Sequence, residues 1–121
     1  MRFLPRLMAG VPFVEPQSVQ DRIKAGEEVL IIDVRTDKEF TSPPGHVPGA
    51  INLNGVELDK KLESAGDGLA SLKSEPIFVM CRTENRAPRA ARLLTKSGFT
   101  DVSIIKGGMT RWSKEGLPTE F

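Results

Sequence analysis

The chain has 121 residues, of which 39% are hydrophobic, and carries a formal net charge of +1, one cysteine and one histidine. This length and composition predict a single globular domain and exclude a disulfide scaffold and a zinc module built from Cys and His, so we expect no metal. The near-neutral charge argues against nucleic acid as a partner, and no apolar run, such as 29–32 or 77–81, approaches the roughly 20 residues that span a membrane.

Residues 1–12 are taken as an N-terminal extension, followed by one domain over 13–118 and a tail over 119–121. Arg2 and Arg6 lie in the extension, but Pro5 interrupts the apolar stretch that a signal peptide would need, so we expect a cytoplasmic protein with no membrane partner.

The first half of the domain predicts alternating strands and helices. A short strand is expected at Phe13–Val14, then a helix from a capping box of Ser18 and Asp21 to Gly26, and a strand buried on both faces over 29–34. Thr36 and Glu39 form a second capping box, which opens a short helix. A loop rich in Pro and Gly over 42–49 and a strand over 50–53 follow.

The second half continues the alternation. Two short helical pieces are expected between 57 and 74, a buried strand over 77–80, a helix over 87–97, a strand over 102–105, a turn at Gly107–Gly108 and a helical turn over 110–114. The pattern predicts an α/β domain with a mainly parallel sheet and helices around it.

Cys81 has the strongest functional signal, because ligands of open α/β sheets bind at the carboxyl ends of strands. The segment after it, residues 82–86, leads into a helix whose first N–H groups have no intrahelical partner, which favours an anion there. Residues 82–96 hold five bases and one acid. A thiol beside Arg at a helix N-terminus ionises readily and becomes a nucleophile. A free Cys is otherwise usually a small buried hydrophobe, and the spacing of Arg89, Arg92 and Lys96 is also typical of a solvated helix face.

Two reactions use a Cys in such a loop. Cysteine-type phosphatases need Arg six residues after the Cys, and that residue here is Ala87. A tighter loop closing at Arg86 suits attack on a sulfane sulfur, which the Cys then holds as a persulfide stabilised by loop amides.

The chain resembles the single-domain rhodaneses, which are sulfurtransferases. The matching segments are 32–35 with Glu39–Phe40, 45–52, the Cys81 loop and 107–112. The resemblance implies a central parallel sheet with helices on both faces and transfer of sulfur from a donor such as thiosulfate to cyanide or a thiol, without a cofactor. With a basic residue at the second loop position, thiosulfate is the expected donor.

Carried over to this chain, the resemblance makes Cys81 the catalytic persulfide carrier. The substrate-binding loop residues would then be Arg82, Thr83, Glu84, Asn85 and Arg86. Glu84 departs from the small residue of many active members, and its carboxylate would either repel an anionic donor or pair with a loop arginine. Structural support is expected from Asp33, Arg35, His46 and Trp112, with Arg35 and Glu39 spaced as an i, i+4 pair.

Two alternatives keep the same fold. In the first, the chain is a sulfur carrier or interaction module that exchanges sulfur with a partner protein. In the second, it is a catalytically silent scaffold, because Glu84 prevents the loop after Cys81 from binding an anion. With no second cysteine to resolve a persulfide, the acceptor must come from outside the chain.

Overall fold

The structure is a computed structural model and describes residues 11–64 and 71–121. In chain order its elements are β1 (Phe13–Val14), α2 (Pro16–Lys24), β2 (Leu30–Asp33), α3 (Asp37–Thr41), β3 (Ile51–Asn52), α4 (Gly55–Ser64), β4 (Ile77–Met80), α6 (Ala87–Lys96), β5 (Val102–Ile105) and α7 (Gly108–Lys114).

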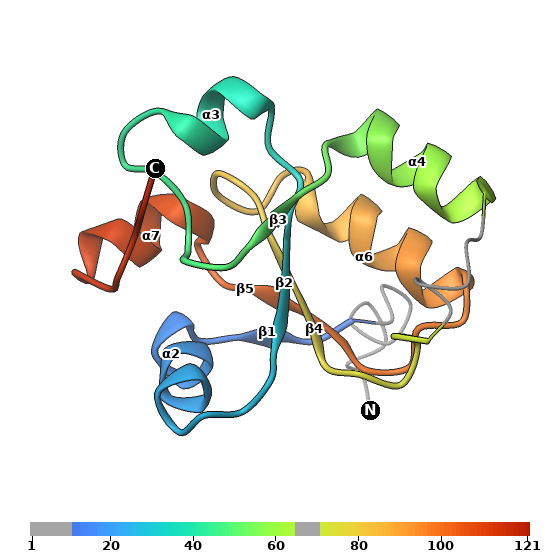
Figure 1. Ribbon diagram of the computed structural model, residues 1–121, viewed down its shortest axis with the longest axis horizontal. Coiled ribbons are helices and arrows are strands. Elements are labelled where there is room, and N and C mark those ends of the chain that lie inside the picture. Colours follow the sequence, from blue (N-terminus) through green and yellow to red (C-terminus); the bar gives the residue numbers. More distant parts are fainter. Residues whose placement is uncertain (1–10, 65–70) are drawn as a thin grey trace, which may run out of the picture.

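The five strands form one parallel sheet in the order β1-β5-β4-β2-β3 (Figure 1). The strand β4 lies at its centre and pairs with β2 on one side and β5 on the other. All four residues of β4 and of β5 are buried, which is why their sequences are apolar runs rather than alternating patterns. The expected α/β class with a parallel sheet is confirmed.

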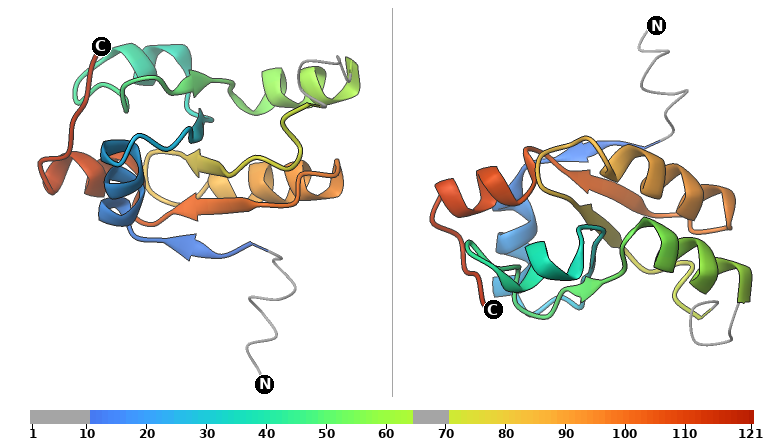
Figure 2. Two further views of the ribbon diagram at one scale, coloured as in Figure 1. Left: turned by 60° about the horizontal axis from the view of Figure 1, so that its bottom comes forward. Right: turned by 90° about the horizontal axis from the view of Figure 1, so that it is seen from above.

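Helices cover both faces of the sheet (Figures 1 and 2). Successive strand side chains point to opposite faces, so Ile32 and Val79 pack with α4 and α6, whereas Ile31 and Phe78 pack with α2 and α7. Each face therefore has its own apolar core, and the carboxyl ends of the strands are left open to loops. Val11 is also buried in the first of these cores.

Two details of the helices differ from the sequence prediction. The helix α2 begins at Pro16, because proline fits the first helical position, and the predicted Ser18 cap is wrong: the Ser18 hydroxyl donates to the Glu15 carbonyl at 2.7 Å. Of the two helical pieces expected between 57 and 74, the first is α4. Residues 71–75 form turns instead, and Leu69 lies outside the described residues.

The Thr36–Glu39 capping box is confirmed, with the Glu39 N–H donating to Thr36 Oγ1 and the Thr36 N–H donating to the Glu39 carboxylate. It fixes α3 above the carboxyl ends of the strands. Within the described residues, the structure contains no helix with the length and apolar character needed to cross a membrane.

Candidate active site

Cys81 follows directly on the central strand β4, and its side chain is 1% exposed. It belongs to the same apolar core as α4 and α6. The segment that follows β2 lies beside the end of β4, because the Val34 N–H donates to the Met80 carbonyl at 2.9 Å. The cysteine therefore lies at the middle of the carboxyl edge of the sheet, with little access to water.

The loop carbonyls after β4 turn toward the start of α7. The Cys81 carbonyl accepts from the Met109 N–H at 2.9 Å, and the Arg82 carbonyl accepts from the Thr110 N–H at 3.0 Å. Both oxygens and that of Thr83 crowd the Cα of Gly108, whose φ is +59° and which has no room for a Cβ. A glycine is thus required where the loop meets α7.

This arrangement dictates where the loop N–H groups point. In a trans peptide the C=O and N–H of one unit point in opposite directions, so three carbonyls that face Gly108 turn the next three N–H groups away from it. Within residues 11–64 and 71–121, none of the backbone N–H groups of 82–86 has a hydrogen-bond acceptor. The loop therefore presents free donors to a ligand, as in an anion-binding nest.

Glu84 takes neither of the two positions considered from the sequence. Its carboxylate accepts a hydrogen bond from the Gly107 N–H at 2.7 Å, and its side chain is half-buried. It is paired with neither Arg82 nor Arg86 in the described part of the chain. The carboxylate is held at the N-terminal end of α7, where the helix dipole favours a negative charge.

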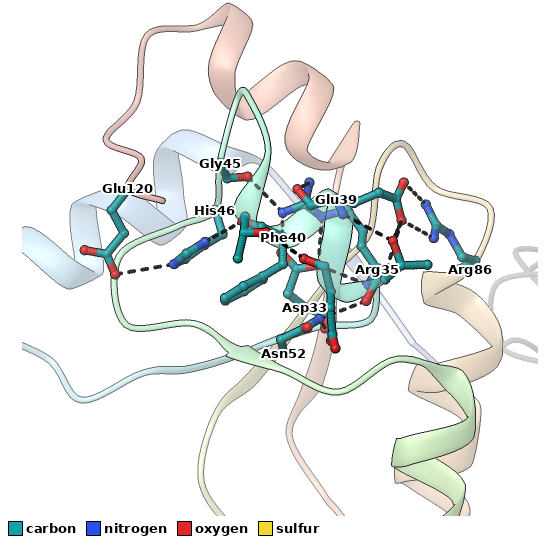
Figure 3. Close-up of polar contacts among 12 residues, drawn as sticks. Asp33, Arg35, Glu39, Phe40, Gly45, His46, Asn52, Arg86 and Glu120 are labelled. Carbon is teal, nitrogen blue, oxygen red and sulfur yellow. Dashed lines mark hydrogen bonds and ion pairs between the residues drawn. The ribbon is translucent and has the colours of Figure 1, made fainter.

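Arg86 forms a bidentate ion pair with Glu39, with N–O distances of 2.7 and 3.0 Å (Figure 3). The hydrogen bonds from Arg86 lower the pKa of Glu39 to about 2. The same pair raises the pKa of Arg86, chiefly through its hydrogen bonds to Glu39. The pair joins the Cys81 loop to α3.

Arg35 and Asp33 form a second, buried pair beneath α3, with side chains 3% and 0% exposed. The Arg35 guanidinium also donates to the carbonyls of Glu39 at 3.2 Å and Gly45 at 2.9 Å (Figure 3). The expected side-chain pair of Arg35 with Glu39 is not formed, because Arg86 occupies the Glu39 carboxylate. The Asn52 amide donates to the Asp33 and Arg35 carbonyls and secures the same turn.

His46 and Trp112 hold the surrounding loops. The His46 Nδ1 donates to the Phe40 carbonyl at 2.7 Å, its ring stacks on Phe40, and its Nε2 lies 3.5 Å from Glu120. Trp112 is fully buried, and its indole N–H donates to the Pro118 carbonyl at 2.8 Å. These hydrogen bonds join loops that surround the site, and the supporting role of the two residues stays a prediction.

The remaining loop residues expected to bind substrate are exposed: Arg82, Thr83 and Asn85. Arg82 lines a cleft of about 540 Å³ together with residues of α3 and α7. Sequence reasoning missed two contributors, namely Glu39 as the partner of Arg86 and Gly108 as the contact surface of the loop. The only sequence signal for the second is the Gly107–Gly108 pair. Among the described residues no group of His, Cys, Asp and Glu side chains could hold a metal ion.

Comparisons with known proteins agree on one family. A family model of the rhodanese-like domain matches residues 15–115. The chain is 36% identical over 108 residues to thiosulfate sulfurtransferase 16, chloroplastic, of Arabidopsis thaliana, covering 83% of this chain and 85% of that protein. It is 29% identical over 107 residues to a probable adenylyltransferase/sulfurtransferase, MoeZ, of Mycobacterium tuberculosis. That match covers 87% of this chain but only 25% of the relative, so the chain spans about a quarter of the relative's length.

Among solved structures, thiosulfate sulfurtransferase from Pseudomonas aeruginosa superimposes with a TM-score of 0.78 at 25% identity. The superposition covers 97% of this chain and 21% of that one.

Proposed function

The chain belongs to the rhodanese-like domain family, and on that premise we propose that it is a sulfurtransferase that carries sulfur from thiosulfate on Cys81 as a persulfide. The observation that carries the proposal is the loop after β4. Its carbonyls are fixed on α7 and its N–H groups are free, so it offers a preorganised site for negative charge beside a buried cysteine.

In the loading step the Cys81 thiolate attacks the outer, sulfane sulfur of thiosulfate. A bond forms between the two sulfur atoms, the S–S bond of thiosulfate breaks, and its electron pair leaves with sulfite. The persulfide anion then carries the single negative charge that the thiolate carried before. The free N–H groups of 82–86 stabilise this anion, and the buried position of Cys81 keeps water from it.

In the discharge step an external nucleophile attacks the terminal sulfur of the persulfide. Cyanide takes the sulfur to become thiocyanate, or a thiolate takes it to become a new persulfide. In both cases the Cys81 thiolate is the leaving group and is restored. Cys81 is the only cysteine of the chain, so no internal thiol competes with the acceptor.

The position of Glu84 supports thiosulfate as the donor. Its carboxylate accepts a hydrogen bond from the Gly107 N–H beside α7, whereas the free N–H groups of the loop point away from Gly108, so the carboxylate leaves those donors to an anion. Arg86 is shared with Glu39, whereas Arg82 has no ion-pair partner within the described residues and is free to attract the donor. We assign Arg82 to donor attraction and Arg86 to support of the loop.

The test is the mass of the intact chain after incubation with thiosulfate, with Cys81→Ser as the control. We expect the wild type to gain one sulfur atom and the variant none, and we expect steady formation of thiocyanate when cyanide is added. A persulfide without turnover would indicate a sulfur carrier instead. If neither thiosulfate nor any other sulfane donor modifies Cys81, the chain is a scaffold and the proposal fails.

A further inference from the structure

The helix α7 has no capping side chain of its own. Its N-cap residue is Gly107, which has no side chain to accept a hydrogen bond. The first N–H groups of a helix have no partner within the helix, so they need acceptors from another part of the chain. The Cys81 loop supplies three: the N–H groups of Gly107, Met109 and Thr110 donate to the Glu84 carboxylate and to the Cys81 and Arg82 carbonyls, respectively. The loop therefore caps α7, and α7 in turn fixes the loop.

Glu84 is the only one of these three acceptors that is a side chain. In the described part of the chain, the backbone hydrogen bonds between the loop and α7 end at the Arg82 carbonyl, whereas α6 begins only at Ala87. The contact of Glu84 with the Gly107 N–H, at 2.7 Å, lies within the stretch 83–86 that these backbone bonds do not reach. A substitution can remove this contact and leave the backbone of the loop unchanged.

The same stretch carries most of the free donors of the loop. The N–H groups of 82–86 have no acceptor within residues 11–64 and 71–121, and they point away from Gly108. Donors that are fixed in advance stabilise a charge without a cost of reorganisation, whereas a loose segment loses conformational entropy when it is ordered. Holding 83–86 in place therefore strengthens the binding of negative charge by the loop.

The charge of Glu84 lies on the α7 side of the loop. Its half-buried side chain is held at the Gly107 N–H, where the helix dipole favours a negative charge, whereas the free N–H groups are turned away from α7. The carboxylate can therefore hold the loop without occupying the donors that an anion would use.

We infer that Glu84 is a positioning residue for sulfur transfer: its carboxylate holds the loop on α7, so that the N–H groups of 82–86 stay directed at the charged sulfur on Cys81. The inference rests on the proposed function, which supplies that charge first as a thiolate and then as a persulfide. It is the opposite of the silent scaffold expected if Glu84 prevents anion binding. Removing the carboxylate slows persulfide formation if Glu84 positions the loop and speeds it if Glu84 repels the donor.

The test compares three substitutions of Glu84. Glu84→Gln keeps an oxygen that accepts from the Gly107 N–H, Glu84→Ala removes it, and Glu84→Asp keeps the charge on a side chain one methylene too short. Each variant is checked for folding by circular dichroism, and the gain of one sulfur on Cys81 from thiosulfate is followed by mass over time. We expect the rate constant to fall by about tenfold in Glu84→Ala and Glu84→Asp, near the lower limit for a hydrogen bond to a charged group, and to stay close to the wild-type value in Glu84→Gln. If Glu84→Ala does not fold, Glu84→Asp and Glu84→Gln decide the question.

Glu115→Ala is the matched control, because the Glu115 carboxylate also binds α7, accepting from Arg111 Nε at 2.6 Å, but at the other end of the helix. It should leave the rate constant unchanged, and an equal fall in Glu115→Ala would mean that general loosening of α7 is responsible and would overturn the inference. A rate constant in Glu84→Ala or Glu84→Asp at or above that of the wild type would also overturn it, as would one in Glu84→Gln as low as theirs.

A second measurement separates this inference from the proposed function. Sulfate is a dianion like thiosulfate but has no sulfane sulfur to transfer. Its binding can be followed by NMR titration of the amide signals of 82–86 in Cys81→Ser, where no thiolate competes for the same donors. We expect adding Glu84→Ala to weaken this binding by about tenfold and adding Glu84→Gln to change it little.

If Cys81 takes up no sulfur in the wild type, the proposed function fails, yet the difference in sulfate binding still decides whether Glu84 positions the loop. Equal sulfate affinities in the three proteins, or no binding by any of them, would overturn the inference.

Discussion

Gly108 is the position where one added methyl group should disturb the Cys81 loop most. A Cβ there would lie 2.5 Å from the Cys81 and Arg82 carbonyl oxygens and closer still to that of Thr83, whereas even a close C–H···O contact needs about 3.3 Å. All three atoms belong to the backbone, so no side-chain rotation relieves the overlap. Adding about 1 kcal/mol for the left-handed φ of +59° and about 1 to 3 kcal/mol for overpacking, we expect Gly108→Ala to cost roughly 2 to 4 kcal/mol.

Gly116→Ala is the matched control, since Gly116 has a φ of +73° but a methyl group added there would meet nothing within 4 Å. It should cost only the conformational part, about 1 kcal/mol. Urea unfolding measures both changes, and with a slope of about 1.5 kcal/mol per M the Gly108 variant should lose roughly 1.3 to 2.7 M in midpoint. Thiosulfate loading of Cys81 should fall in Gly108→Ala alone. Equal midpoints for the two variants, with full loading in both, would refute the packing of the loop carbonyls against α7.

Three further outcomes follow from the ion pairs of the site. Arg86→Ala should lower kcat/KM for thiosulfate by roughly tenfold, whereas the exposed Arg92→Ala on the same helix should leave it nearly unchanged; equal losses would count against the loop as described. Because the pKa of Glu39 is lowered to about 2, its contribution to stability is present above pH 4.5 and is lost as the pH falls toward 2. The wild type should therefore be more stable than Glu39→Gln by about 1 to 2 kcal/mol after solvent screening at neutral pH. This difference should vanish between pH 4.5 and 2 when unfolding is followed in acid titrations. Arg35→Met should lower the free energy of unfolding by about 3 to 5 kcal/mol by leaving Asp33 buried and unpaired, and adding Asp33→Asn should recover part of it in the same denaturation assay.

The parts of the fold that depend on local sequence were predictable. The apolar runs that became β4 and β5 have the length and composition of strands buried on both faces, and the spacing of Thr36 and Glu39 specified a cap that the structure contains. The predicted Ser18 cap was wrong because another local signal, a proline at the first helical position, starts the helix at Pro16. In these segments the outcome depends on neighbouring residues in the sequence and not on distant parts of the chain.

The polar partners in the site could not be predicted in this way. Glu84 bonds to Gly107, 23 residues away, and Arg86 bonds to Glu39, 47 residues away. Each has nearer oppositely charged or polar neighbours in the sequence, and only the parallel order of β5, β4 and β2 decides which loops meet. The i, i+4 spacing of Arg35 and Glu39 favours an ion pair between them, but the Glu39 carboxylate binds Arg86 from the loop after β4 instead.

The same topology explains how one loop can be both rigid and open to a ligand. In residues 11–64 and 71–121, the backbone hydrogen bonds of Cys81 and Arg82 use their carbonyl oxygens, which accept from Met109 and Thr110, and the N–H groups of 82–86 have no acceptor. The acidic side chains nearby are committed to other donors, Glu84 to the start of α7 and Glu39 to Arg86. An incoming anion therefore meets fixed donors and no free carboxylate from these two residues, so the loop needs little reorganisation when a charged sulfur species binds or forms there.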